Sequence, residues 1–477
     1  MHPTLEEFEE LSKHYNRVTV YEEMDGDMDT PVSILSKLLS LDRAILLESA
    51  KESKVYSRFS FLAFNIKEKL TFGADGLYRG DKRIGEPAQL SEMLLQNRTA
   101  PSNGFGDFSG GYVGHINFEF VEQCGILRRP LSRAGAVGGV LYLVDRFCVY
   151  DNYTNRLYVA VSRKIDGNIP AEAIYERIRE ELKETERELK ALSGIRPMPL
   201  NATVTRTIPR QSFTDRVQKI KDMIESGEAI QVVLSDYLEV NNLDPFQFYR
   251  NLRKINPSPY MFFIKDADSF IVGSSPEVHI RVRGNKAYLR PIAGTKPRGA
   301  SDNVEDIIDV LSNDEKEKAE HLMLVDLARN DLSRICRPGS IAVESFMQPE
   351  VYSHVVHLVS QVSGDLEGTA DVFDAITQTF PAGTVSGAPK TRAIEIIDEL
   401  EDTSRNVYSG CVGYIGFNGN VDMAITIRTA VFNGFRARMQ AGAGIVYDSV
   451  PEREYEEVMN KLGALIKSGG VHDSVDR

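Results

Sequence analysis

Two pairs of glutamates stand at helical spacing in the second half of the chain. Glu317 and Glu320 are three residues apart, and Glu454 and Glu457 have the same spacing. Side chains three positions apart share one face of a helix, and two such faces on one cleft would supply the hard oxygen ligands that suit Mg²⁺. Solvated helix faces have the same pattern. The mostly apolar run 321–325 favours the metal interpretation, because a carboxylate at the start of a buried stretch requires a partner.

Donors for an anion occur in three other segments. The loop 383–390 is rich in small residues that expose backbone N–H groups, and Lys390 begins a predicted helix. The pattern is typical of an anion-binding loop but is not a Walker loop, and a plain turn is the alternative. Gly442 and Gly444 indicate a second place where backbone can approach a ligand. Arg428, in a strand-like run, suits bidentate recognition of a carboxylate, with a solvated strand end as the alternative.

His357 lies in the apolar run 355–359. A lone histidine in such surroundings is more often a core residue whose ring nitrogens are satisfied. Its functional interpretation is that of a general acid or base.

The pattern of apolar residues predicts the elements that carry these side chains. Helices are expected over 170–192, from Ser212 (the expected N-cap) to Ile224, from about 314 to 330 and from about 454 to 467. Strands are expected at 44–47, 140–144, 156–161, 230–234, 261–264, 270–272 and 278–282. Helices and strands mix without a regular βαβ alternation, which predicts an α+β fold.

The segment 193–199 contains a glycine and two prolines, which end the preceding helix and are typical of an exposed linker. The main boundary is placed there, with an N-terminal region at 1–195 and a second region at 205–470. A long connection within one body is the alternative.

The composition is that of a globular protein. The chain has 477 residues, 42% hydrophobic and 26% charged, with a net charge of −13. The negative charge argues against general binding to nucleic acid. No apolar run reaches the ~20 residues that span a bilayer, so no membrane attachment is expected. The cysteines lie far apart without C-x-x-C spacing, which argues against a zinc site or disulfide framework and favours the reducing cytoplasm. They are Cys124, Cys148, Cys336 and Cys411.

Five segments, taken together and in this order, resemble the motifs of the chorismate-utilising enzymes. They are 273–277 (GSSPE), 290–295 (RPIAGT), 320–331 (EHLMLVDLARND), 383–390 (GTVSGAPK) and 440–444 (QAGAG). The resemblance runs from about Arg206 to Lys467. It implies the fold of that family, which is two stacked β-sheets flanked by helices in four layers (α/β/β/α), with the site between the sheets.

Two positions resemble the ammonia-using, anthranilate-forming branch of the family. Gln231 stands where the water-using isochorismate and salicylate synthases carry a lysine base, and Ala293 stands where many aminodeoxychorismate synthases carry a nucleophilic lysine. The resemblance therefore implies that chorismate and ammonia are converted to anthranilate and pyruvate. Aminodeoxychorismate synthase and isochorismate or salicylate synthase are the alternatives. A further alternative is a non-catalytic sensor protein. The presence of all four glutamates argues against it.

The resemblance also implies Mg²⁺ as the cofactor. Glu320 and Glu457 would bind the metal directly, and Glu317 and Glu454 would bind its water ligands.

Roles for the remaining site residues follow from the same resemblance. Glu277 would protonate the leaving ring hydroxyl, His357 would assist the loss of pyruvate, and Thr384 would help to seat the ring. Gln231 is grouped with these catalytic positions. The expected substrate contacts are Ala293, Gly294, Thr295, Tyr408, Arg428, Gly442, Ala443, Gly444 and Lys461.

Two more segments resemble the tryptophan-feedback motif of anthranilate synthases. They are 46–49 (LLES) and 256–262 (NPSPYMF). Prolines stiffen the second segment, and the carboxylate in the first would suit an ammonium group. The expected tryptophan contacts are Glu48, Ser49, Pro259, Tyr260, Met261 and Tyr414. The roles of Lys54 and Arg58 stay open.

The chain contains no recognisable Cys–His amidotransferase signature. The resemblance therefore implies that a separate glutamine amidotransferase subunit (component II) supplies ammonia from glutamine, and that tryptophan inhibits this first committed step of its own biosynthesis.

Overall fold

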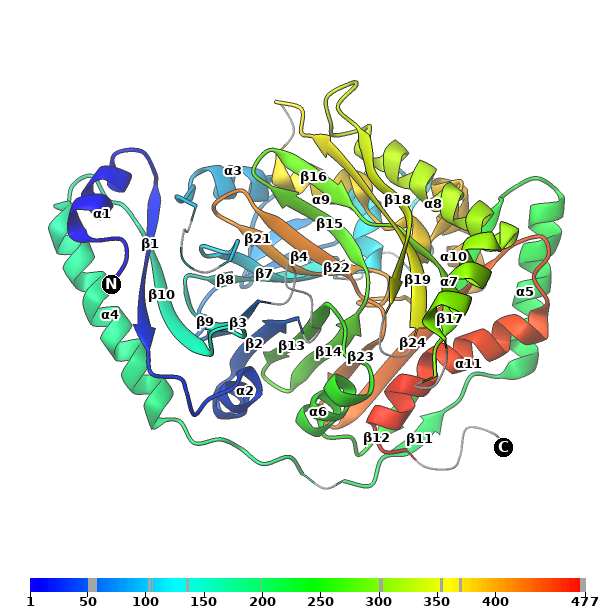
Figure 1. Cartoon of the computed structure of the whole chain (residues 1–477), viewed down its shortest axis with the longest axis horizontal. Coiled ribbons are helices and arrows are strands. Elements are labelled where there is room, and N and C mark those ends of the chain that lie inside the picture. The colour runs from blue at the N-terminus through cyan, green and yellow to red at the C-terminus, as the bar shows by residue number, and fades with distance from the viewer. Residues whose placement is uncertain are drawn as a thin grey trace.

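Two β-sheets stacked face to face form the centre of the molecule, and helices cover their outer faces (Figure 1). The structure is a computed structural model that describes residues 1–49, 58–101, 104, 106–133, 137–198, 200–299, 303–351, 355–368 and 371–471. None of the helices in these ranges is long and apolar enough to cross a membrane. The expected α+β fold with two stacked sheets flanked by helices is confirmed.

The first sheet joins strands from both ends of the chain in antiparallel pairs. Its order is β1 (Arg17–Met24), β10 (Arg156–Lys164), β9 (Arg146–Asp151), β3 (Phe59–Phe64), β2 (Arg43–Glu48), β13 (Tyr260–Asp266), β14 (Ser269–Ser275), β23 (Thr429–Asn433), β24 (Arg436–Ile445), β12 (Gln231–Asn241) and β11 (Thr203–Arg206), and β20 (Gly387–Ala388) pairs with β12.

The second sheet is built in the same way. Its order is β17 (Ile292–Pro297), β19 (Val355–Asp365), β16 (Lys286–Leu289), β15 (Val278–Arg283), β22 (Val421–Ile425), β21 (Cys411–Gly416), β7 (Gly111–Ile116), β8 (Gly139–Val144), β4 (Lys69–Gly73), β5 (Gly76–Arg79) and β6 (Lys82–Gly85), and β18 (Ala342–Val351) pairs with β19.

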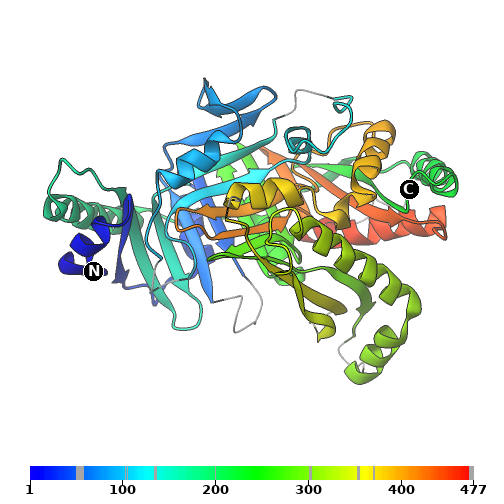
Figure 2. The same ribbon diagram turned by 90° about the horizontal axis from the view of Figure 1, so that it is seen from above.

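The helices divide between the two sheets. Those on the first sheet are α2 (Pro31–Leu38), α4 (Ala171–Ala191), α5 (Arg210–Glu225), α6 (Pro245–Ile255) and α11 (Pro451–Ser468). Those on the second are α7 (Val304–Asn313), α8 (Glu315–Leu332) and α9 (Val372–Thr379). Helix α10 (Lys390–Leu400) also packs against β12 and β20 of the first sheet. The others are α1 (Leu5–Ser12), α3 (Gln89–Leu95) and the 3₁₀ helices η1 (Phe118–Gln123) and η2 (Gly383–Val385). Helices α1 and α4 lie at one end of the molecule, and α5 and α11 lie at the other (Figure 2).

The regions 1–195 and 205–470 share both sheets. In the first sheet β2 of one region pairs with β13 of the other, and in the second sheet β7 pairs with β21. The segment between the regions runs from α4 to β11 along one side of the molecule (Figure 1). Both regions therefore contribute strands to each sheet.

Most predicted elements are confirmed, with shifted ends. Helix α4 buries Ile174, Ile178 and Leu182 along one stripe, as its pattern predicts. The expected cap at Ser212 is wrong, because α5 begins at Arg210 after Pro209, and no side chain caps it. A proline already restricts the backbone for a helix start, since its ring holds φ near the helical value.

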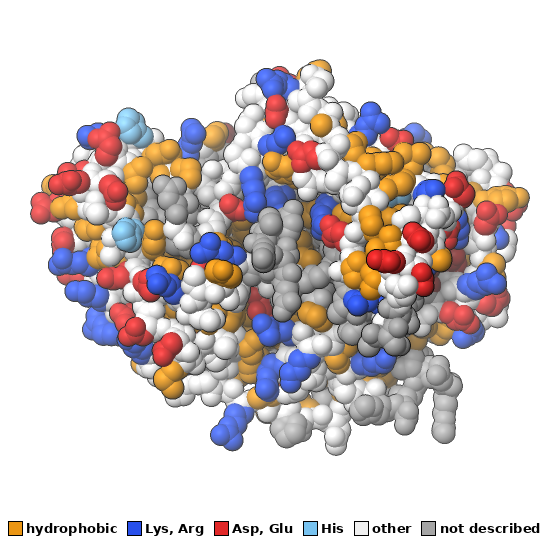
Figure 3. Space-filling view, in the orientation of Figure 1, with side chains coloured by type: hydrophobic (Ala, Val, Ile, Leu, Met, Phe, Trp, Pro, Cys, Tyr) orange, Lys and Arg blue, Asp and Glu red, His pale blue; other side chains and the backbone are white. Residues whose placement is uncertain are grey.

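The interior is one large apolar core that extends across both sheets, with a second cluster between them. That second cluster contains Ile45 and Phe262 from the first sheet and Val113 and Tyr414 from the second, which shows that the sheets pack on each other. All four cysteines are buried and unpaired. Acidic and basic side chains are mixed over the face drawn in Figure 3.

Candidate active site

Two glycines on β24 form the floor of the candidate site. Gly442 lies opposite Ser235 of β12, and Gly444 lies opposite Val233. A Cβ at Gly444 would stand 2.6 Å from the Nε2 of Gln231, and one at Gly442 would stand 3.0 Å from the Tyr408 hydroxyl. A Cβ at Gly442 would also stand 2.7 Å from the backbone carbonyl oxygen of Leu234, so that position requires glycine, whereas the Gln231 side chain would have to move to admit a Cβ at Gly444. The side chain of Ala443, between them, is fully buried, so this residue offers only its backbone on the glycine face.

Lys461 connects this floor to the acidic groups. Its ammonium nitrogen donates to the carbonyl oxygen of Gly442 at 2.9 Å and forms an ion pair with Glu457 at 2.7 Å. Burial raises the pKa of Glu277 and of Glu320, and the charge of the same ammonium opposes both increases, so both carboxyls lie within its field. One lysine on α11 therefore lies close to the general acid, the metal-ligand and the substrate-binding positions expected from the sequence.

Glu277 follows β14 and lies beside the η2 loop. It lines a cavity of about 40 Å³ together with Thr384. Burial raises the pKa of Glu277 to about 7, and the nearby Thr384 hydroxyl and the charge of Lys461 oppose the increase. A carboxyl whose pKa is near neutral can hold a proton at physiological pH and donate it.

The four predicted metal ligands lie on two helices, α8 and α11. Partial burial raises the pKa of Glu320, and the charges of Glu317 and Glu457 raise it further. Burial also raises the pKa of Glu454, again with a contribution from Glu457. Carboxylates of α8 and α11 thus lie close enough to repel one another.

This donor set fits a magnesium ion. Within the described ranges, no three acidic, histidine or cysteine side chains converge closely enough to hold a metal ion by themselves. Mg²⁺ usually takes one or two protein carboxylates and keeps its remaining water ligands. Facing carboxylates that repel one another are therefore suited to a hydrated dication, which would neutralise them.

Arg428 is a cation without a carboxylate partner. Within the described residues, no ion pair or hydrogen bond holds its guanidinium, and burial lowers its pKa while Tyr408 beside it opposes the decrease. Burial raises the pKa of Tyr408 to about 12, so its hydroxyl stays protonated. A partly buried, unpaired guanidinium beside a hydroxyl suits the carboxylate of a ligand.

The expectation that Arg428 lies on a strand is wrong. Strand β22 ends at Ile425 and β23 begins at Thr429. Arg428 lies in the bend between them with φ of 51°, in the left-handed region that strands do not use. Its carbonyl oxygen accepts a hydrogen bond from the backbone N–H of Ser274 at 3.1 Å, which fixes the bend.

Most of the motif 290–295 lies in β17, beside α8. Gly294 has φ of 75°, in the left-handed region that favours glycine, and a Cβ there would be in van der Waals contact with Oε2 of Glu317 at 3.5 Å. The carbonyl oxygen of Ala293 lies 3.4 Å from the Nδ1 of the buried His321. His357 is partly buried on β19, directly opposite Thr295 in the ladder.

The loop 383–390 does not offer its lysine to a ligand. Lys390 is buried, and its ammonium group binds both carboxylate oxygens of Asp331 at 2.9 Å and the carbonyl oxygen of Thr379 at 3.1 Å. The interpretation of Lys390 as part of an anion-binding loop is therefore wrong. The loop instead places Thr384 beside Glu277, as the pKa of that carboxyl indicates.

The predicted tryptophan contacts all line a separate large cavity of about 960 Å³ between the sheets. Glu48 and Met261 are paired in the ladder between β2 and β13, and Tyr414 comes from β21 of the second sheet. The Glu48 carboxylate already accepts hydrogen bonds from Tyr249 and Arg253. The Ser49 hydroxyl is buried and has no hydrogen-bond partner among the described residues. The predicted tryptophan contacts that line this cavity are Glu48, Ser49, Pro259, Tyr260, Met261 and Tyr414.

The structure describes only one of Lys54 and Arg58, the two residues whose roles stayed open. Arg58 lines the large cavity but forms an ion pair with Asp151 at 2.8 Å. Lys54 lies outside the described residues.

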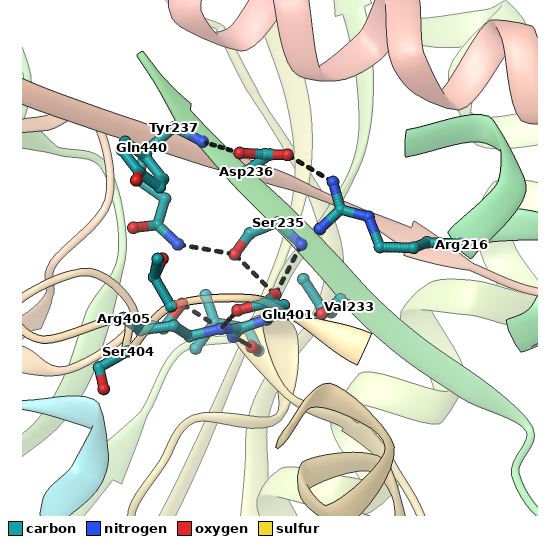
Figure 4. Close-up of polar contacts among 12 residues, drawn as sticks. Arg216, Val233, Ser235, Asp236, Tyr237, Glu401, Ser404, Arg405 and Gln440 are labelled. Atoms are coloured by element: carbon teal, nitrogen blue, oxygen red, sulfur yellow. Dashed lines mark hydrogen bonds and ion pairs between the residues drawn. The ribbon is translucent and has the colours of Figure 1, made fainter. Parts of the chain in front are cut away.

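A buried polar network beside the site was not predicted from the sequence (Figure 4). The Arg405 guanidinium donates to both oxygens of Glu401, and the Ser235 N–H and hydroxyl donate to Glu401 as well. Gln440 in turn donates to the Ser235 hydroxyl at 2.9 Å. The pair has i, i+4 spacing, but α10 ends at Leu400, so helical periodicity does not signal it.

Comparison with known proteins agrees with this geometry. A family model described as "chorismate binding enzyme" matches residues 42–467. The chain is 39% identical to anthranilate synthase component 1 of Aquifex aeolicus, over 98% of this chain and 97% of that protein. It is 38% identical to the protein of the same name from Acetivibrio thermocellus, with 98% of each covered.

Solved structures show the same fold. Anthranilate synthase component I of Streptococcus pneumoniae superposes with a TM-score of 0.75 at 33% identity, covering 87% of this chain and 93% of that one. The menaquinone-specific isochorismate synthase of Escherichia coli superposes with a TM-score of 0.70 at 19% identity, covering 97% and 98%, which shows the fold alone. The match along almost the entire length, together with the site described above, shows that this chain belongs to the family of chorismate-binding enzymes.

Proposed function

We propose that this chain is the catalytic subunit of an anthranilate synthase, which converts chorismate and ammonia to anthranilate, pyruvate and water. The position of Gln231 is the observation that carries this proposal. Its amide lies against Gly444 on the floor of the site, where the sequence resemblance places a lysine base in water-using relatives. An amide cannot activate water as a base, so a nucleophile that already carries a lone pair, such as ammonia, suits the site better.

Substrate binding would use the unpaired cations and donors of the floor. Arg428 and Tyr408 would bind the enolpyruvyl carboxylate, together with the backbone at Gly442 and Gly444. Glu320 and Glu457 would hold Mg²⁺ directly, and Glu317 and Glu454 would hold its water ligands. The metal, when bound, would neutralise the ring carboxylate and keep it in place.

The first chemical step would replace the ring hydroxyl by an amino group. Ammonia attacks the ring carbon next to the one that bears the carboxylate, and the ring hydroxyl leaves as water. Glu277 donates the proton that the leaving oxygen needs, and its pKa of about 7 means that it holds this proton at neutral pH. Thr384, which lies beside Glu277, helps to seat the ring.

The second step would remove the side chain as pyruvate. The ring carbon that carries the new amino group loses a proton, the ether bond to the enolpyruvyl group breaks, and the ring becomes aromatic. His357, partly buried on β19, is the proposed proton carrier for this step.

The ammonia would come from a separate glutaminase subunit. All four cysteines of this chain are buried, and burial raises the pKa of the thiols of Cys148 and Cys411, so neither is poised as a glutaminase nucleophile. The isolated chain should therefore use ammonium salts and not glutamine. Anthranilate formed from glutamine by the isolated chain would contradict this part of the proposal.

The deciding experiment combines the purified chain with chorismate, Mg²⁺ and ammonium and follows anthranilate by its fluorescence. Anthranilate that disappears when EDTA is added supports both the activity and the metal. A product that retains the pyruvyl group would indicate an aminodeoxychorismate synthase instead. A hydroxylated product formed without ammonium would indicate an isochorismate synthase.

A further inference from the structure

One edge of β12 has no neighbouring strand at the level of the candidate site. Strand β12 pairs with β24 on one side, and on the other side β20 covers Gln231 and Val232 while β11 covers 239–241. Between these two short strands, no strand in the described part of the chain pairs with this edge. Buried backbone groups need hydrogen-bond partners, so other groups must bind those of Val233 and Ser235.

A buried ion pair takes the place of the missing strand (Figure 4). The Arg405 guanidinium donates to the carbonyl oxygen of Val233 at 2.7 Å, and the Glu401 carboxylate accepts a hydrogen bond from the Ser235 N–H at 2.8 Å. Both charged side chains are buried. In the ladder with β24, Val233 and Ser235 lie directly opposite the two glycines of the floor. The pair therefore holds the part of β12 that supports the floor.

The same guanidinium attaches the η2 loop to β12. It donates to the carbonyl oxygen of Val385 at 2.7 Å, and Val385 directly follows Thr384. The Val233 N–H adds a second attachment, because it donates to the carbonyl oxygen of Ser386 at 2.9 Å. Thr384 lines the same cavity as Glu277. The guanidinium thus holds the loop one residue after the hydroxyl that lies beside the proposed general acid.

Arg405 also belongs to the turn that carries Tyr408. The Tyr408 N–H donates to the carbonyl oxygen of Arg405 at 3.1 Å, and the guanidinium donates to the Ser409 hydroxyl at 3.2 Å. The guanidinium carbon lies 5.7 Å from the centre of the Tyr408 ring. One residue therefore connects three parts of the candidate site, which are the floor, the η2 loop and the turn at Tyr408.

The contacts of Arg405 use every donor that an arginine side chain has. A guanidinium is planar and holds five N–H donors in fixed directions, whereas lysine has three donors on one nitrogen. Burial alone would lower the pKa of Arg405, but the charge and hydrogen bonds of Glu401 outweigh it and raise the pKa, so the group stays charged. The five hydrogen bonds go to Val233, Val385, Ser409 and, twice, Glu401.

Stability alone does not account for this pair. Removing two charges from water is costly, and well-packed apolar residues of the same volume often stabilise a fold as well or better. Apolar side chains cannot supply directed donors to carbonyl oxygens on two separate segments. The feature that the ion pair adds is therefore the fixed geometry of the η2 loop and β12.

We propose that Arg405, held by Glu401, is a positioning residue for the reaction, which fixes Thr384 and Tyr408 relative to the glycine floor. This inference rests on the proposed function, because it concerns how the groups of that reaction are oriented. Arg405 acts through these groups and not by contact with the substrate. A misplacement of about 1 Å can lower a rate roughly 100-fold, so loss of these hydrogen bonds should lower kcat much more than substrate affinity.

The first test is Arg405→Lys in the full-length chain. Lysine keeps a positive charge beside Glu401, but its one nitrogen cannot replace donors that point from three atoms toward Val233, Val385 and the carboxylate. We expect kcat to fall roughly 100-fold while the KM for chorismate changes little, which is the result of lost orientation and not of lost binding. The melting temperature shows that the variant is folded.

The matched control is Arg438→Lys, in the same polar network. Arg438 is partly buried and donates to Thr403, Ser404 and Gln440. Among the described residues, none of its side-chain hydrogen bonds reaches the η2 loop or Val233. This variant should keep the kcat of the unchanged protein.

A double variant, Glu401→Gln with Arg405→Met, separates positioning from stability. Both buried charges are removed together, an amide oxygen remains for the Ser235 N–H, and methionine fills much of the volume, so the fold should be retained. The kcat should still fall as far as in Arg405→Lys, because no donor reaches the carbonyl oxygens of Val233 and Val385.

Hydrogen–deuterium exchange gives a measurement that needs no turnover. The backbone of 383–388 should exchange faster in Arg405→Lys and in the double variant than in the unchanged protein, while α11 keeps its exchange rate. Unaltered exchange in 383–388 of both variants would show that Arg405 does not hold the loop, and would overturn the inference.

The two proposals fail in different ways. If the unchanged chain forms no anthranilate from chorismate and ammonium, the proposed function fails, whatever the exchange rates are. If anthranilate forms and the folded double variant keeps the kcat of the unchanged protein, the ion pair serves only the fold and the inference is overturned. An equal loss of kcat in Arg438→Lys would also overturn it, because the effect would not depend on contacts with the loop.

Discussion

At the scale of single residues, the site depends on groups whose surroundings alter their ordinary chemistry. Glu277 has a carboxyl whose pKa burial raises to about 7, and Arg428 has a guanidinium that no described carboxylate neutralises. A buried acid that stays protonated and a cation that stays unpaired are both costly to the fold. Such groups are typical of sites that have been shaped for a ligand.

The change Glu277→Gln should abolish turnover while chorismate binding, measured by calorimetry, stays within about threefold. In the unchanged protein, kcat should fall as the pH rises through about 7, because the acid form of Glu277 is the one that donates a proton. Near-normal turnover of the variant would rule out this role.

Glu277 should also make the stability of the fold depend on pH. The folded-state pKa of Glu277, about 7, lies above its ordinary 4.5, so its stabilising contribution is complete below pH 4.5 and is lost as the pH rises through 7. The melting temperature of Glu277→Gln should therefore decrease less between pH 5 and pH 8 than that of the unchanged protein. Parallel pH profiles would show that the carboxyl is not buried in solution.

Arg428→Gln should weaken chorismate binding by roughly 10–100-fold, since one charge-assisted hydrogen bond contributes ~1.5–3 kcal/mol. Arg436→Gln is the matched control, because Arg436 is exposed and pairs with Glu239 on the neighbouring strand. Equal affinity in the two variants, measured by calorimetry, would remove Arg428 from the substrate contacts.

At the scale of elements, α8 and α11 approach the site from different parts of the chain and present facing carboxylates. Asp314 caps α8 by accepting hydrogen bonds from the backbone N–H groups of Lys316 and Glu317, which fixes where this acidic face begins. Helix α11 packs on β24, which places Lys461 over Gly442. The relative positions of two helices thus decide whether a metal site exists.

Magnesium chloride should raise the melting temperature of the unchanged protein, and EDTA should remove the increase, because the ion relieves repulsion between the two helices. Glu320→Gln should lose most of this increase. Glu315→Gln should keep it, since Glu315 is exposed on the same helix and pairs with Lys318. The same response in both variants, followed by thermal scanning, would place the ion elsewhere.

At the scale of the whole molecule, the large cavity exists because both regions of the chain contribute to both sheets. Strand β2 of the first region pairs with β13 of the second, and Tyr414 approaches from the other sheet. Tyr260 is held in place because its hydroxyl donates to Asp422 at 2.8 Å and accepts from Arg281 at 2.6 Å. A ligand bound there would bridge the two sheets that also hold the active site.

Tryptophan should inhibit anthranilate formation and should raise the melting temperature of the chain in the absence of chorismate. Ser49→Ala should raise the half-inhibitory concentration of tryptophan by roughly 3–10-fold, the value of one ordinary hydrogen bond. The control is Ser40→Ala, an exposed serine at the end of α2. An unchanged half-inhibitory concentration in Ser49→Ala would show that the Ser49 hydroxyl does not contact tryptophan.

Much of the fold could be predicted from local pattern. The stripe of α4, the acidic faces of α8 and α11 and the apolar strands depend on periodicity within a few residues, and they lie where that periodicity places them. The exact ends of helices and strands were not predicted where more than one residue could begin or end the element. Proline at the start of α5 replaced the serine cap, and β12 continues to Asn241 because pairing with β24 and β11 extends it.

The sequence by itself determined the element types, the candidate carboxylates and the family motifs, because these depend on residue identity and short spacing. The tertiary structure decided which of those groups are free to act. Lys390 looks available in the sequence, yet a buried carboxylate 59 residues earlier, Asp331, binds it. Arg428 looks like a strand residue, yet the bend between β22 and β23 leaves it unpaired beside Tyr408. Burial and long-range pairing set the protonation state and the partners of each group, and both arise only when distant segments pack together.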